Sequence, residues 1–308
     1  MLVLYGGTGF IGRHICEEAS RRESDVAVIS RRPNVEFLSS LGTKVVSARA
    51  GTDAAQALIS KATTVVYLAN TSKPGSTFES LSEIVTEDLA AVTGFIENLY
   101  QTNPDCKFIY LSSGGQIYGR DHARPISEDS PEHPRTPYAL SKLLNENMLD
   151  YFRSKTQASI LVLRLANPIG HWQVGTSHGL VSAAVSAAIT GNPLTIFGDG
   201  TNARDYFDVD DFAKFICYLH MQDHVVNGTF NIGSGEAKTE RDVIKSIETS
   251  LELSMIVNKA PARDFDFPYA VLDVTRARDD LSWSPQTSLS DSIKKIAIAV
   301  KRKLADTA

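Results

Sequence analysis

The feature that most constrains this chain is a glycine-rich segment near its N-terminus, Gly6-Gly7-Thr8-Gly9-Phe10-Ile11-Gly12. The segment follows the apolar run Leu2 to Tyr5, which has the length and composition of a buried strand. It leads into apolar residues at helical spacing, Ile11, Ile15 and Ala19. Glycines placed between a buried strand and an amphipathic helix are typical of a dinucleotide-binding turn, whereas in another context they would mark an ordinary turn.

Each glycine of the segment has an expected task. We expect Gly6 to permit the tight turn, Gly9 to let the backbone approach a pyrophosphate, and Gly12 to let helix and strand pack closely. The phosphates would lie on the N-terminus of the helix, where the backbone N–H groups have no partner within the helix. Phe10 and Ile11, in the first helical turn, are expected to line the same cofactor site.

Short apolar runs without polar alternation recur along the first half of the chain, which is typical of strands buried on both faces of a parallel sheet. They are Leu2 to Tyr5, Val26 to Ile29, Val65 to Leu68, Phe108 to Leu111 and Ile160 to Leu165. Helical patterns lie between them, and a parallel crossover needs a helix on a sheet face. The sequence therefore predicts an α/β fold, a Rossmann-like doubly wound parallel sheet.

The pattern becomes looser after residue 165. We expect residues 1–165 to form an NAD(P)-binding domain, with a return segment near residues 205–233. Residues 166–308 would then form mainly a smaller α+β lobe at the C-terminus that binds the substrate.

Composition excludes several classes of protein. The formal charge of −5, from 31 Lys and Arg against 36 Asp and Glu, provides no basic excess for a nucleic-acid backbone. The three cysteines are far apart, so they predict buried apolar residues rather than a zinc or redox site, and no metal is expected. Without a long apolar stretch or a leader-like N-terminus, we expect no membrane association and a cytoplasmic location.

The residues after the second apolar run bear on the choice of cofactor. An acidic residue there normally accepts from the adenosine ribose of NAD, but this chain has Ser30-Arg31-Arg32. Arginine suits a 2′-phosphate, because its planar fork binds phosphate through two hydrogen bonds. The cofactor is thus expected to be NAD or NADP, with Ser30, Arg31 and Arg32 favouring NADP. The alternative is that both arginines point into solvent.

A tyrosine and a lysine one helical turn apart provide candidate catalytic groups. Tyr138-Ala139-Leu140-Ser141-Lys142 places a phenol and an ammonium on one helix face. A neighbouring cation favours the phenolate, so we expect Lys142 to lower the pKa of Tyr138. Ser112-Ser113 ends the fourth apolar run, at the sheet edge where ligands of such folds bind.

With these motifs in this order, the chain resembles the extended short-chain dehydrogenases/reductases of the NAD-dependent epimerase/dehydratase family, which includes the UDP-glucose 4-epimerases. The resemblance covers almost the whole length. Besides the glycine segment and Tyr138 to Lys142, it rests on Ser112 to Gly119, Arg164 to Gly170, Phe197 to Gly200, Arg204 to Asp211, Arg263 to Asp266, and Trp283-Ser284-Pro285.

The resemblance implies roles for individual residues. Tyr138 is the acid/base, Lys142 holds the nicotinamide ribose, and Ser113 assists. The cofactor is bound by Gly6, Gly9, Phe10, Ile11, Gly12, Ser30, Arg31, Arg32, Leu68, Ala69, Asn70, Tyr138 and Lys142. The nucleotide-diphosphate sugar is held by Gln116, Asn167, Phe197, Arg204, Arg263 and Asp266, although Arg204-Asp205 alone would fit an ordinary surface salt bridge. The family also implies a homodimer through helices around residues 89–100 and 140–151.

The chain departs from the family at several positions. The usual catalytic Ser or Thr position holds Gly114, so we assign the hydroxyl to Ser113, with Gln116 as a polar substitute. Gly115 and Gln116 replace the acidic pair of the 4,6-dehydratases, so dehydration is not expected. Asp88 stands where the epimerases usually carry Asn. Gly114 and Gly115 together would leave room for a keto sugar to turn.

The leading hypothesis from the sequence is a nucleotide-sugar 4-epimerase that acts through a transient 4-keto intermediate and hydride return. The alternative is an NADPH-dependent reductase of a nucleotide-activated 4-keto-6-deoxyhexose. A more distant alternative, a non-catalytic dinucleotide-sensing regulator on the same fold, predicts loss of the Tyr-x-x-x-Lys pattern, which this chain retains.

Overall fold

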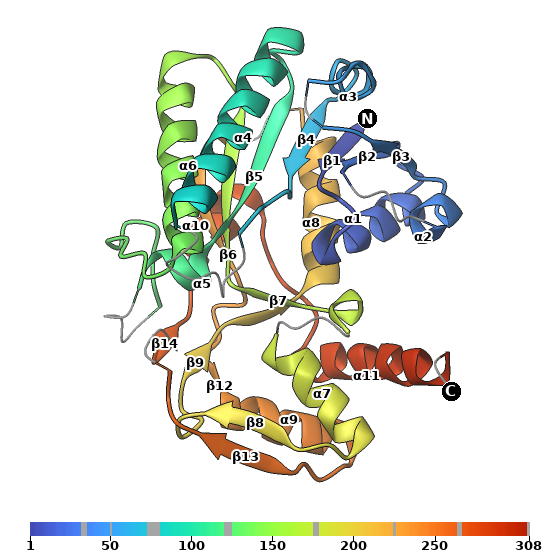
Figure 1. Ribbon diagram of the computed structural model, residues 1–308, viewed down its shortest axis with the longest axis vertical. Coiled ribbons are helices and arrows are strands. Elements are labelled where there is room, and N and C mark those ends of the chain that lie inside the picture. The colour runs from blue at the N-terminus through green and yellow to red at the C-terminus, as the bar shows by residue number, and fades with distance from the viewer. Residues whose placement is uncertain are drawn as a thin grey trace.

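A seven-stranded parallel sheet forms the centre of the larger part of the molecule in the computed structural model (Figure 1). The structure describes residues 1–31, 36–49, 51–72, 81–119, 125–174, 179–223, 226–263 and 267–306. In spatial order the strands are β11 (Gly228–Ile232), β6 (Ile160–Leu165), β5 (Lys107–Ser113), β4 (Thr64–Tyr67), β1 (Leu2–Tyr5), β2 (Val26–Ser30) and β3 (Lys44–Ser47). Every neighbouring pair is parallel, and the order reverses between β1 and β4, the switch point where ligands of such sheets bind. The predicted Rossmann-like fold is confirmed.

Helices cover both faces of this sheet because its strands are apolar on both sides. Residues of α1 (Phe10–Arg21), α8 (Val209–Met221) and α10 (Thr275–Leu281) pack in one core cluster. Those of α3 (Asp53–Ile59), α4 (Leu81–Thr102) and α6 (Pro137–Lys155) pack in the other. Short α2 (Glu36–Ser40) precedes β3, and α5 (Gly114–Ile117) follows β5 directly. The side chains of β1 alternate between the two clusters, with Val3 in one and its neighbours Leu2 and Leu4 in the other.

A smaller group of helices and short strands lies below the sheet in Figure 1 and has its own apolar core. Its helices are α7 (Leu180–Thr190), α9 (Glu240–Leu251) and α11 (Leu289–Ala305), with the 3₁₀ turn η2 (His171–Gln173). Its strands pair as β8 (Leu194–Phe197) with β13 (Val257–Ala260), β7 (Asn167–Ile169) with β10 (Tyr206–Asp208), and β9 (Ala203–Arg204) with both β12 (Lys238–Thr239) and β14 (Tyr269–Ala270). The chain returns from this part to the sheet through α8 and β11, while the predicted division at residue 165 stays a prediction.

A partly buried polar cluster joins the two parts where α1, α8 and α11 meet. The His14 ring lies 2.6 Å from Asp210 through Nδ1, and Lys295 Nζ donates to Asp210 at 2.8 Å. Burial lowers the pKa of His14, against its hydrogen bond with Asp210. Burial acts to raise the pKa of Asp210, but hydrogen bonds from His14 and Lys295 hold it well below its usual value. We call these three residues the junction cluster.

The three cysteines, Cys16, Cys106 and Cys217, are buried and free, as their isolated positions predict. In the described ranges, no helix has the length and apolar character needed to cross a membrane.

Candidate active site

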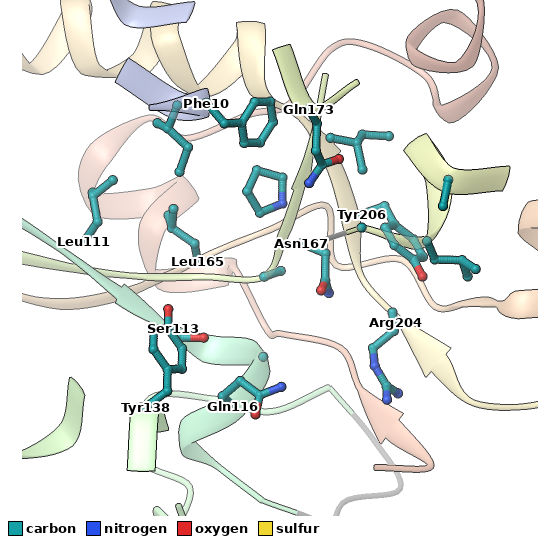
Figure 2. A pocket seen from close by; sticks show the side chains of 18 of the residues that line it. Phe10, Leu111, Ser113, Gln116, Tyr138, Leu165, Asn167, Gln173, Arg204 and Tyr206 are labelled. Carbon is teal, nitrogen blue, oxygen red and sulfur yellow. The ribbon is translucent and has the colours of Figure 1, made fainter. Parts of the chain in front are cut away.

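A pocket of about 780 Å³ lies at the carboxyl edge of the central sheet and extends to the smaller group of elements. The glycine segment, the ends of β4, β5 and β6, and the start of α6 line one side. Residues of α7, β8, β9 and β10 line the other. Figure 2 shows Tyr138 and Ser113 on one side, Arg204 and Tyr206 on the other, and Asn167 between them.

The glycine segment has the shape that a diphosphate requires. Gly6 has φ +84°, and a side chain there would meet the Ala69 backbone nitrogen at 2.6 Å. A Cβ on Gly12 would lie 2.2 Å from the Gly7 carbonyl oxygen, so only glycine lets α1 pack on the turn. Gly9 differs, because a Cβ there would meet nothing within 4 Å and Gly9 lines the pocket. It leaves an open cradle at the N-terminus of α1, where no side chain caps the helix.

Tyr138 is placed by a well-capped helix. Thr136 accepts from the Ala139 N–H at 3.1 Å, and Pro137 occupies the first turn of α6, so the helix begins directly before Tyr138. The Ser113 side chain hydrogen-bonds Tyr138. Lys142, one turn further, is 5% exposed and donates from Nζ to the Leu111 carbonyl oxygen at 2.8 Å.

The protonation of this pair differs from the expectation. Burial raises the pKa of Tyr138 to about 12, while the hydrogen bond with Ser113 acts in the opposite direction. The Lys142 Nζ lies 5.8 Å from the centre of the Tyr138 ring and donates a hydrogen bond to a backbone carbonyl. Desolvation therefore exceeds the effect of the cation, and Tyr138 is a neutral phenol at neutral pH, a proton donor.

The two glycines after Ser113 are not equivalent. A Cβ on Gly114 would meet Leu272 Cδ1 at 2.5 Å and the Arg164 carbonyl oxygen at 3.1 Å, so this position faces the core. A Cβ on Gly115 would find only Asn167 Nδ2, at 4.0 Å, and Gly115 lines the pocket. The expected room beside the sugar is thus at Gly115 and not at Gly114.

The cations of the far side are held by backbone and aromatic groups. Arg204 donates through Nη1 to the carbonyl oxygens of Ala203 and Phe267, at 3.0 and 2.6 Å. The Arg263 guanidinium lies over the Phe197 ring, 4.2 Å from its centre. Both arginines line the pocket and provide the local positive charge that an anionic ligand needs.

Asp205, next to Arg204, has another task. It is fully buried, so it is not part of a surface salt bridge. Its carboxylate accepts from the backbone N–H groups of Ser234 and Gly235, and its carbonyl oxygen accepts from Asn167 Nδ2 at 3.0 Å. Asp205 therefore fixes Asn167 in the middle of the pocket.

The structure places most of the predicted site residues around this one pocket. Its lining includes Gly6, Gly9, Phe10, Ile11, Gly12, Leu68, Asn70, Ser113, Gln116, Tyr138, Lys142, Asn167, Phe197, Arg204 and Arg263. Ala69 packs against the turn at Gly6 rather than lining the pocket. Ser30 and Arg31 lie at the carboxyl end of β2, whereas Arg32 and Asp266 fall outside the described residues.

The sequence analysis missed a group beside Ser30. The Thr8 and Ser30 hydroxyl oxygens are 3.0 Å apart, and the Thr8 carbonyl oxygen accepts from Arg13 Nε at 3.0 Å. The Arg13 guanidinium lies over the Trp172 ring, 4.8 Å from its centre. Arg13 is one helical turn after Gly9, which is a usable signal, but Trp172 reaches it from η2, and no local pattern predicts that contact.

Tyr206 was also missed on the substrate side, where it lines the pocket. It follows Arg204 by two residues, the spacing that puts side chains on one side of an extended chain. The motif that contains both residues was recognised, but this spacing was not used.

Comparison with known proteins places these features in a family. The family model described as "NAD dependent epimerase/dehydratase family" matches residues 2–233. The chain belongs to this family. It is therefore an enzyme of the extended short-chain dehydrogenase/reductase type, and the family is NAD-dependent.

The relatives of this epimerase/dehydratase-family protein differ in their activities. A dTDP-4-dehydro-6-deoxyglucose reductase of Escherichia coli is 28% identical over 313 aligned residues, covering 98% of each chain. A UDP-glucose 4-epimerase of Mycolicibacterium smegmatis is 33% identical over 191 residues, covering 61% of this chain and 60% of that protein. The crystal structure of a Thermotoga maritima UDP-glucose 4-epimerase with UDP-glucose has a TM-score of 0.87 at 24% identity, covers 98% of this chain and 99% of its own, and shows the shared fold.

Proposed function

We propose that this protein is an NADPH-dependent reductase that converts the 4-keto group of a nucleoside-diphosphate 4-keto-6-deoxyhexose to a hydroxyl. The observation that carries the proposal is the positively charged end of β2, which suits a phosphorylated cofactor. A reductase consumes its cofactor and must exchange it at each turnover, whereas an epimerase restores it. The sequence alone ranked the epimerase first, and three observations reverse that order.

The first observation is the environment of Ser30. The segment from residue 26 to residue 35 contains no Asp or Glu, so no carboxylate directly after β2 accepts from the adenosine ribose. Arg13 donates directly from Nε to the Thr8 carbonyl oxygen, and the Thr8 hydroxyl lies within hydrogen-bond distance of the Ser30 hydroxyl. Arg31 follows Ser30 and is exposed. Two arginines and two hydroxyls are the groups expected around a 2′-phosphate.

The second observation is the protonation of Tyr138. A ketone reduction needs a proton at the oxygen that becomes the hydroxyl. The half-buried phenol of Tyr138, whose pKa is raised to about 12 by desolvation, carries that proton at neutral pH. Tyr138 donates it, Ser113 holds the phenol in place, and solvent returns a proton to the phenolate. When bound, the nicotinamide supplies the hydride to C4. Lys142 would hold its ribose.

The third observation is the identity to relatives that align along nearly the whole chain. The Escherichia coli reductase aligns with 98% of this chain at 28% identity, compared with 26% over 95% of this chain for a UDP-glucose 4-epimerase of Lactobacillus helveticus. In our assignment Arg204 and Arg263 bind the diphosphate, Asn167 and Gln116 contact the sugar, and Phe197 lies against the nucleoside. Lining groups from two separate parts of the fold would thereby enclose one extended ligand.

A 4-epimerase is the second candidate, because Gly115 leaves open space beside Asn167 where a keto sugar has room to turn. The two activities are separated by one experiment. The purified protein is incubated with a dTDP-4-keto-6-deoxyhexose and NADPH, and in parallel with UDP-glucose without added cofactor. We expect NADPH oxidation in proportion to the hydroxyl product. Interconversion of UDP-glucose and UDP-galactose without NADPH consumption would exclude the reductase as the main activity.

The cofactor assignment has a separate test. Arg31→Asp and Arg13→Gln should each weaken NADPH binding by about 10-fold or more while changing NADH binding by less than about 3-fold, because only NADPH has the extra phosphate. Arg302→Gln, an exposed arginine near the end of α11, is the matched control. Equal losses for the two cofactors would show that neither arginine contacts the 2′-phosphate.

A further inference from the structure

Asp88 is a buried carboxylate on α4 that joins two segments of the active site. It is 4% exposed. Its Oδ1 accepts from the Thr71 N–H at 2.8 Å, and its Oδ2 accepts from the hydroxyls of Ser72 at 2.7 Å and Ser141 at 3.0 Å. Thr71 and Ser72 belong to the loop after β4, and Ser141 lies on α6 directly before Lys142. One side chain therefore ties the cofactor-side loop to the catalytic helix.

Within the described residues, no Lys or Arg forms an ion pair with Asp88. The three hydrogen-bond donors to its carboxylate in that part of the chain are neutral. Glu146, the other carboxylate near Lys142, is held by Arg164, whose Nε and Nη2 donate to its Oε2 at 2.9 and 2.6 Å. A buried unpaired charge is costly, so its retention calls for a compensating cation nearby.

Lys142 is that cation. Its Nζ lies 4.7 Å from the centre of the Tyr110 ring and is shielded from water. The titratable groups around it are Tyr110 on β5, Tyr138 and Glu146 on α6, Arg164 on β6 and Asp88 on α4. Burial lowers the pKa of Lys142 to about 8, and Asp88, followed by Glu146, opposes that shift. Asp88 is the larger of the two opposing carboxylate effects, and it bonds Ser141, the residue before Lys142, whereas Glu146 is paired with a guanidinium.

We propose that Asp88 is a positioning residue for the reaction proposed above, on which this inference rests. Its hydrogen bonds hold the loop after β4 against α6, and its negative charge, beside the neighbouring residue Ser141, favours the ammonium form of Lys142 in a dry site. An ammonium has three N–H donors, so Lys142 can bond the Leu111 carbonyl oxygen and still donate to ribose hydroxyls. A neutral amine has only two donors and carries no charge to stabilise a phenolate at Tyr138.

Two variants separate the charge from the hydrogen bonds. Asp88→Asn removes the charge but retains an acceptor for the Thr71 N–H and an amide that can bond the two hydroxyls. Ser141→Ala removes one hydrogen bond and leaves the charge. The titration of Lys142 is followed in the full-length protein by NMR of lysine labelled at Cε, with Lys142→Met used to assign the signal.

We expect the midpoint of the Lys142 titration to fall by about 1 pH unit or more in Asp88→Asn. In Ser141→Ala it should fall by less than about a third of that amount. The alkaline limb of the pH dependence of kcat should move by the same amount in Asp88→Asn. An unchanged midpoint in Asp88→Asn, or an equal shift in Ser141→Ala, overturns the proposal. If no candidate sugar is turned over by any variant, the proposed function fails, while the midpoint still tests the role of Asp88.

Discussion

The cofactor side of the pocket is assembled from consecutive strand ends of one sheet, whereas the substrate side is assembled from short segments far apart in the sequence. On the cofactor side, the ends of β1, β4 and β5 follow the same strand–turn rule, and glycine backbone shape determines what fits. On the substrate side, Asn167, Arg204 and Arg263 come from three separate segments. Backbone carbonyls hold Asn167 and Arg204, and the Phe197 ring lies under the guanidinium of Arg263. The first side is specified by backbone geometry and the second by individual side chains.

This difference predicts that changes on the cofactor and catalytic side act in an all-or-none manner. Tyr138→Phe removes the proton donor while leaving the ring and the glycine cradle in place. We expect kcat to fall by about 10³-fold or more, equivalent to roughly 4 kcal/mol, with NADPH affinity changed by less than about 3-fold.

The matched control is Tyr110→Phe. The Tyr110 hydroxyl is buried and has no hydrogen-bond partner in the part of the chain that the structure describes. This variant should keep kcat within about 2-fold of wild type. Turnover by Tyr138→Phe above a tenth of wild type would remove Tyr138 from the mechanism.

Changes on the substrate side should be graded. Arg204→Met should raise KM for the nucleotide sugar by about 10- to 100-fold, or roughly 1.4 to 2.7 kcal/mol, with little effect on kcat, because Arg204 lies across the pocket from Tyr138. Arg204→Lys should recover part of the loss. Arg241→Met, which removes a contact to the Asp199 carbonyl oxygen outside the pocket lining, is the control. A loss of kcat equal to the loss of kcat/KM would contradict the division between the two sides.

Substitutions in the junction cluster test whether charge interactions hold the two sides together. Asp210→Asn removes the carboxylate shared by His14 and Lys295, while Lys295 keeps its contact with Asp208 at 3.2 Å. We expect a loss of about 1 to 3 kcal/mol in the free energy of unfolding at neutral pH. A depressed carboxylate pKa gives stability that is present above the unfolded value, about 3.9, and is lost as the pH falls through the folded one. The difference in the free energy of unfolding between wild type and Asp210→Asn should thus be the same at about pH 8 and about pH 6, as measured by denaturant unfolding.

Two histidines contribute to the pH dependence of the wild type, His14 of the junction cluster and His220, whose pKa is lowered to about 4 by burial. Burial lowers the pKa of His14 as well, so in both cases the unfolded state binds the proton more readily. Stability is then present above about pH 6.5 and falls as the pH drops below that value. His14→Gln should flatten this slope in the same measurement, and an unchanged slope would show that the cluster is not its source.

The smallest expected effect concerns the two adjacent glycines. Gly115→Ala adds a methyl group to open space in the pocket, and we expect kcat/KM to change by less than about 5-fold, with stability unaffected. Gly114→Ala would place its Cβ 2.5 Å from Leu272 Cδ1, so it should lower stability by about 1 to 3 kcal/mol. Equal behaviour of the two variants in thermal melts would contradict their assignment to pocket and core.

Local patterns predicted much of the fold and the cofactor side because they are dictated by a few consecutive residues. The strand before Gly6 and the helix after Gly9 follow from apolar spacing and backbone freedom. The edge strand β3 was not predicted, because its Lys44-Val45-Val46-Ser47 is short and only partly buried. The protonation of Tyr138 was not predictable either, since desolvation depends on packing from several elements.

Contacts between residues far apart in the chain could not be predicted from the sequence. Nothing near Arg13 indicates that Trp172 packs on its guanidinium, and nothing near Asn167 indicates that the Asp205 backbone fixes it. Asp88 was noted as a departure from the family, but its partners Ser72 and Ser141 are known only from the fold. Motifs identified the candidate site residues, and the tertiary structure shows what the described ones contact.

The uncapped start of α1 at Gly9 makes the cofactor part of the folding equilibrium. The first N–H groups of a helix need acceptors, and here no side chain at the N-cap provides one. A bound diphosphate would complete the helix, so native and unfolded chains would differ in their affinity for it. Ligand at 100 times its Kd would then add about 2.7 kcal/mol to the free energy of unfolding. The concentration of free dinucleotide would thereby set how long each molecule survives unfolding and proteolysis as well as how fast it turns over.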